Sequence, residues 1–90
     1  RESYSAGLLA FHVFCGAWDV AEEQRAPASC LLVLTFIAGC TGIYSGTTVR
    51  NYTASVHAWH MLHGLSWNVE EDELKALLKG ADRQAPPTSK

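Results

Sequence analysis

Residues 45–62 read SGTTVRNYTASVHAWHML, and this stretch decides the fold. Its large apolar residues recur at steps of three, four and three, which is the repeat of an α-helix with one buried face. Ser45 precedes the run as a candidate N-cap, and Gly64 follows it as a stop signal. We therefore predict a helix near 46–62, with a core stripe made of Val49, Tyr52, Val56 and Trp59.

Two more helical segments precede this stretch. The first is predicted near 4–15, with Ser3 as its cap and Gly16 just beyond its end. The second is predicted near 29–40, with Ser29 as its cap and glycines at 39 and 42 ending it. On the first helix, the apolar face expected to look inward is made of Tyr4, Leu8, Phe11, Cys15 and Trp18. On the second, Leu31, Leu34 and Ile37 recur at three-residue steps, while Leu32, Val33 and Phe36 leave almost no polar face, so this helix is expected to be the most buried.

The last helix has the fullest set of local signals. Asn68 is the candidate cap, Glu71 follows three residues later, and Gly80 is the expected stop. We predict a helix near 69–79 that contributes Leu74 and Leu77 to the core. A helical domain over 1–81 and a proline-containing linker over 82–90 follow from this reading.

Length and composition favour a single compact domain. The chain has 90 residues, of which 48% are hydrophobic and 18% charged, and no segment alternates with the period of a β-strand. We predict an all-α, small four-helix bundle. The three cysteines are odd in number and lack metal spacing, which favours an intracellular protein. The strongly apolar run 31–38 is about half as long as a membrane span, so we expect no membrane partner.

Several short motifs stand in an order that resembles a known family. In chain order they are Tyr4, Leu8, Phe11 to Cys15, Ala26 to Ser29, Ser45 to Val49, Tyr52, Ala58 to His60, and Leu77 to Ala81. Together they resemble the N-terminal core-binding domain, also called SAM-like, of tyrosine recombinases and phage integrases, in particular the recombinase-like sequences of basidiomycete mobile elements. The resemblance covers nearly the whole chain and implies a small four-helix bundle.

What this resemblance implies is a clamp without catalytic residues. In the family, the bundle covers one side of the DNA, while a separate C-terminal domain covers the other side and carries the catalytic Arg, His-x-x-Arg and Tyr. We therefore expect no enzyme activity in these residues, a catalytic domain downstream in the parent protein, and a nuclear location. The expected partner is double-stranded DNA, with a homo-oligomer on the DNA left open. The alternative is a protein-protein interaction or oligomerisation bundle that uses exposed aromatics such as Trp18 and Trp67.

The candidate DNA-binding residues lie at the start and on the polar face of the third helix. A helix N-terminus favours an anion, and the hydroxyls and one arginine add donors, although Ser45 and Thr48 could simply cap the helix. No acid occurs from 41 to 63, yet the family commonly has Lys at Thr47 and Arg at His57, and the net charge is −2. We expect weak binding with little sequence preference. The candidate set is Ser45, Thr47, Thr48, Arg50, Asn51 and His57.

The histidines and tyrosines suggest other chemistry only at first sight. His57, His60 and His63 form an H-x-x-H-x-x-H string, but His63 is turned about 600° from His57 along a helix, and no acid or cysteine completes a ligand set. We predict no metal site and no cofactor. Tyr4 and Tyr52 lie on core stripes, so we assign them to packing rather than to nucleophilic attack.

Overall fold

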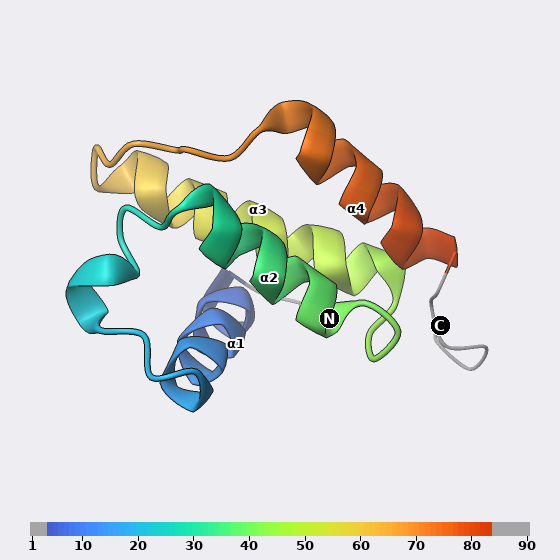
Figure 1. The fold of residues 1–90 in the computed structure, drawn as a ribbon, viewed down its shortest axis with the longest axis horizontal. Coiled ribbons are helices and arrows are strands. Elements are labelled where there is room, and N and C mark those ends of the chain that lie inside the picture. Colours follow the sequence, from blue (N-terminus) through green and yellow to red (C-terminus); the bar gives the residue numbers. More distant parts are fainter. Residues whose placement is uncertain (1–3, 84–90) are drawn as a thin grey trace.

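The computed structural model describes residues 4–83 and shows a small all-α bundle (Figure 1). Its helices are α1 (Tyr4–Ala17), α2 (Cys30–Cys40), α3 (Gly46–Leu62) and α4 (Glu71–Arg83), and a short 3-10 turn, η1 (Glu22–Gln24), lies between α1 and α2. No β-strand occurs within residues 4–83, so the predicted fold class is confirmed. In the same range, none of the helices combines the length and apolar character needed to cross a bilayer.

α3 is the central element of the bundle. It contacts α1, α4 and α2, while α2 packs mainly against α4, and α1 and α4 lie on opposite sides of the molecule (Figure 1). α1 and α3 approach closely at Gly7, where a Cβ atom would lie 2.5 Å from the Cβ of Ser55. A glycine at this position therefore allows the two helix backbones to pack closely.

The core predicted from the helical stripes is confirmed. Phe11 packs edge to face against Phe36, with ring centroids 5.3 Å apart. This geometry is one that aromatic pairs prefer. Of the predicted core residues, Phe11, Ile37, Val49 and Val56 are buried, while Leu8, Leu34, Tyr52, Trp59, Leu74 and Leu77 are partly buried and pack against them.

Two residues placed on inward rows are instead exposed. Leu31 is 76% exposed and Trp18 is 65% exposed. α2 was expected to be apolar nearly all round, but only one face is fully buried, and it is made of Val33, Phe36, Ile37 and Cys40, which follow the i, i+3, i+4, i+7 pattern. Trp18 comes after the last residue of α1, so the helical period no longer fixes its direction.

The helix ends follow local chemistry, with corrections. Ser29 caps α2 as predicted, since its Oγ accepts a hydrogen bond from the Leu32 N–H at 3.1 Å. α1 does not end before Gly16 but continues to Ala17, and Asp19, with φ of 57°, takes the left-handed position. Asp is among the few residues that tolerate this conformation. Glycine 39, expected to end α2, lies inside that helix.

The end of α3 matches its prediction. Gly64 has φ of 65°, and the Leu65 N–H donates to the His60 carbonyl at 2.9 Å. The Gly64 N–H also donates to the Met61 carbonyl at 3.1 Å. These two bonds form a Schellman motif, for which glycine at the left-handed position is the favoured residue.

α4 differs from its prediction at both ends. Its first turn is capped by Glu70 rather than by Asn68, because the Asp72 N–H donates to Glu70 Oε1 at 2.9 Å. Gly80, expected as the stop, lies inside the helix, which continues to Arg83. Ala81 is fully buried, so packing extends the helix past the predicted domain end at residue 81. The remainder of the predicted linker, the Ser3 cap and the Tyr4 side chain lie outside the described residues.

A buried histidine ties α3 to the turn that precedes α2. His60 is fully buried, and its Nε2 accepts a hydrogen bond from the Ala28 backbone N–H at 2.9 Å. Because Nε2 acts as an acceptor, the ring proton of the neutral form lies on Nδ1, which donates to the Val56 carbonyl at 2.9 Å. Both ring nitrogens are thus used for structure.

Candidate nucleic-acid interface

The predicted site begins at the first turn of α3. Ser45 is the N-cap, and its Oγ accepts from the Thr48 N–H at 3.1 Å and lies 3.0 Å from Thr48 Oγ1. The capping interpretation of these two residues is therefore confirmed. Capping uses one backbone donor of this turn, while the partial positive charge of the helix terminus remains.

A carboxylate from the far end of the chain lies against this turn. A Cβ atom on Gly46 would come within 1.9 Å of Asp82 Oδ1, so only glycine leaves room for the Asp82 side chain as it stands. Asp82 also pairs with Arg50, whose Nη1 donates to Asp82 Oδ1 at 2.9 Å and whose Nη2 donates to Oδ2. The pair is bidentate, which is the strongest arrangement for arginine and a carboxylate.

This ion pair changes the charge expected at the site. The sequence has no acid from 41 to 63, but α4 continues to Arg83 and brings the carboxylate of Asp82 to Arg50. The hydrogen bond with Arg50 lowers the pKa of the Asp82 carboxyl, against an opposing effect of desolvation, and the same bond raises the pKa of Arg50. Both side chains are about half exposed, at 46% and 47%. Water and salt therefore weaken the pair, and a competing anion can reach it.

The remaining predicted residues lie further along the exposed face of α3. Thr47, Asn51 and His57 are all exposed. His57 lies ten positions after Thr47, so at about 1.5 Å per residue the face is about 15 Å long. The His57 ring lies against the ring of Trp67, with centroids 4.6 Å apart and planes 32° apart. His57 is thus held at the far end of the face, away from the Arg50 pair.

The site is therefore only partly the one predicted. Ser45 and Thr48 are hydrogen-bonded at the start of α3, and Asp82 lies against Gly46 and pairs with Arg50. Asn51 and His57 follow along the helix. Asp82 was missed because α4 was expected to end before Gly80. A signal for the longer helix was present, since Ala81 continues the apolar stripe of Leu77 and Leu78 at helical spacing.

The other reactive residue types have structural surroundings. No group of three or more His, Cys, Asp or Glu side chains within residues 4–83 is arranged to hold a metal ion. Burial raises the pKa of the Cys40 thiol to about 11 and also raises that of Cys15, where nearby Arg25 opposes the shift. Both thiols are therefore largely protonated at neutral pH and weakly nucleophilic.

No family model, curated protein or solved structure matches this chain. Fold and site together define a small all-α bundle. Its central helix begins with a serine cap beside an exposed arginine–carboxylate pair.

Proposed function

We propose that this chain is a non-catalytic DNA-clamping domain of a tyrosine-recombinase-like, nuclear protein, and that it grips the duplex through the start and polar face of α3. The resemblance of the motifs over nearly the whole chain is the first support. The main support is the position of the Asp82 carboxylate, which shows that an anionic group fits between the first turn of α3 and Arg50.

A DNA phosphate would take the place of this carboxylate. Arginine binds phosphate with the same bidentate geometry that it uses for a carboxylate. When the phosphate displaces Asp82, the Thr47 hydroxyl and the Asn51 amide lie on the same exposed face and can reach neighbouring backbone oxygens. These contacts hold the protein to the backbone and read no base, so sequence preference is small.

The charge balance sets the strength of this grip. The chain has 7 basic and 9 acidic residues, and the one arginine of the α3 face is paired with Asp82. Few counterions are released when so few cations meet phosphates, so the affinity is low and weakens as salt rises from about 50 to 200 mM. A second domain or a second copy on the same DNA would be needed for tight binding.

The experiment compares the wild type, single variants and one double variant in a titration of labelled duplex at low salt. Arg50→Ala is expected to remove binding, whereas Thr47→Lys with His57→Arg is expected to tighten it. Asp82→Asn is expected to tighten it as well, because this change frees Arg50 and removes a negative charge.

Matched controls separate a local effect from a change in net charge. Lys79→Ala removes one cation from α4, and Asp72→Asn removes one anion from its first turn. The proposal fails if Lys79→Ala weakens binding as much as Arg50→Ala does, or if Asp72→Asn strengthens it as much as Asp82→Asn. Absence of binding in every variant also overturns it.

A further inference from the structure

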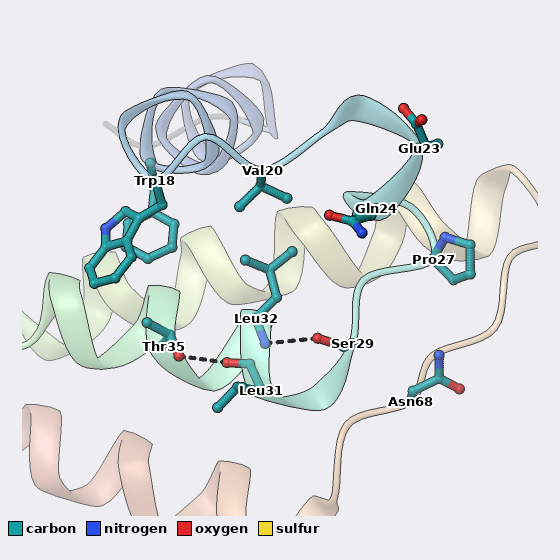
Figure 2. A pocket seen from close by; sticks show the side chains of 11 residues that line it. Trp18, Val20, Glu23, Gln24, Pro27, Ser29, Leu31, Leu32, Thr35 and Asn68 are labelled. Atoms are coloured by element: carbon teal, nitrogen blue, oxygen red, sulfur yellow. Dashed lines mark hydrogen bonds between the residues drawn. The ribbon is translucent and has the colours of Figure 1, made fainter.

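A large apolar groove lies between the end of α1, the loop that follows it and the first half of α2, and its lining includes neither Arg50 nor Asp82. Its volume is about 720 Å³, which falls in the range of ligand-binding pockets. Phe14 comes from the last turn of α1. Trp18 and Val20 come from the loop that follows α1, and Leu31 and Leu32 come from α2 (Figure 2). The groove thus joins the exposed residues that the helical periods had placed inward.

Two of the large apolar side chains that line the groove are exposed. Leu31, on α2, is 76% exposed, and Trp18, in the loop after α1, is 65% exposed (Figure 2). A scattered exposed leucine needs no explanation, but adjoining exposed apolar residues around a hollow mark interaction sites. Tryptophan is also the residue most enriched where binding energy concentrates.

Two hydroxyl groups of the groove are already hydrogen-bonded within the chain, and the lining contains one charged side chain that a partner could pair with. The Ser29 hydroxyl is bonded to the Leu32 N–H, and the Thr35 hydroxyl donates to the Leu31 carbonyl at 2.7 Å. Glu23 is the charged residue of the lining, and it is exposed.

The nearest cation in sequence does not neutralise this carboxylate. Arg25 is directed inward, where its Nε donates to the Val20 carbonyl at 3.0 Å and its Nη1 lies 3.3 Å from His12 Nδ1. Within residues 4–83, the single ion pair joins Arg50 and Asp82, so no basic side chain of this range pairs with Glu23. The rim of the groove is therefore negative, with Asp19 and Glu22 also exposed nearby in the chain.

We propose that this groove docks a basic amphipathic helix of another protein. The helix would place an apolar stripe between Trp18 and Leu31 and pair a lysine or arginine with Glu23. The size of the groove suits several side chains rather than one, which matches the repeating anchors of a helix in a groove. The complementary charge selects a basic partner and excludes an acidic one. This inference goes beyond the DNA-clamping proposal and does not depend on it.

The test uses two synthetic amphipathic helices as probes. Both carry leucines along one face, and one has lysines flanking them while the other has glutamates at the same positions. Fluorescence anisotropy measures the affinity of each labelled peptide for the full 90-residue chain. Backbone amide shifts then locate the contact. We expect the lysine peptide to bind and to move the amide signals of Val20, Leu32 and Thr35, and the glutamate peptide to bind at least about tenfold more weakly.

Matched substitutions test the groove itself. Leu31→Asp is expected to lower the affinity for the lysine peptide at least about tenfold. Leu62→Asp, at a position on α3 that is 75% exposed, is expected to change this affinity by less than about twofold. Glu23→Lys is expected to reverse the preference between the two peptides. Asp72→Lys makes the same change of charge at a residue outside the groove lining and is expected to leave the preference for the lysine peptide unchanged. Since all four residues are exposed, the variants should fold, and circular dichroism checks this.

Three outcomes would overturn the proposal. Equal binding of the two peptides would show that charge selects nothing, and equal effects of Leu31→Asp and Leu62→Asp would show that the peptide does not use this groove. If the chain forms dimers in sedimentation and Leu31→Asp dissociates them, the occupant is a second copy of the chain. DNA titration reports on a different surface, so failure here leaves the clamping proposal to its own test.

Discussion

Replacing His60 with leucine tests the buried link between α3 and the turn before α2. The imidazole is fully buried and accepts the Ala28 N–H at 2.9 Å. Leucine fills a similar space but cannot accept a hydrogen bond, so the Ala28 amide is left buried without a partner. An unsatisfied buried donor costs about 1–3 kcal/mol. The loss at Val56 adds little, because that carbonyl still receives the backbone bond of its helix.

The expected loss is large compared with the total stability of so small a domain. For about 80 ordered residues, the free energy of unfolding is on the order of 4–12 kcal/mol. A loss of about 2 kcal/mol lowers the melting temperature by roughly 8–16 °C. Thermal and urea unfolding followed by circular dichroism measure both quantities.

His63→Leu is the matched control for this change. His63 is exposed and lies just past the end of α3, where its backbone N–H, not its ring, makes the capping bonds. A surface substitution of this kind changes stability by less than about 0.5 kcal/mol. If the two variants lose the same stability, or if His60→Leu loses none, the hydrogen bond to Ala28 does not stabilise the fold and the reasoning is refuted.

Three further changes follow from the packing and the charges. Gly7→Ala should destabilise the fold by about 1–3 kcal/mol, because the new Cβ meets α3 at 2.5 Å, whereas Gly16→Ala, with nothing within 4 Å, should stabilise it by about 0.5–1 kcal/mol in denaturant titrations. The Cys40 thiol has its pKa raised to about 11, so its alkylation should stay slow at neutral pH and accelerate as the pH rises toward that value. A fast reaction at neutral pH would contradict this. The pKa of Asp82 is lowered, so the stability from its pair with Arg50 is present above the ordinary carboxyl pKa and lost as pH falls through the lowered one. In Arg50→Ala, the pKa of the Asp82 carboxyl, measured by NMR titration, should rise toward its ordinary value. An unchanged pKa would show that the pair does not form in solution.

Only part of the candidate site could be predicted from the sequence. Ser45 and Arg50 could be placed because a cap and a helical face depend on neighbours within a few residues. Asp82 could not be joined to them, because 32 residues separate it from Arg50 and the bond depends on how α4 packs across α3. The DNA-binding role itself stays a prediction, supported by the family resemblance and by the position of the Asp82 carboxylate between Gly46 and Arg50.

The same division runs through the whole fold. The sequence by itself determined the four helices, the caps at Ser29 and Ser45, the stop at Gly64 and most of the core, because periodicity and capping are local properties of the chain. The tertiary structure alone decided that α4 continues to Arg83 and that Leu31 remains exposed. It also decided that His60 is buried against a distant backbone amide. In each case the local sequence signal was weak or misleading. The length of α4 and the burial of these side chains depend instead on the free energy of packing distant segments of the chain against one another.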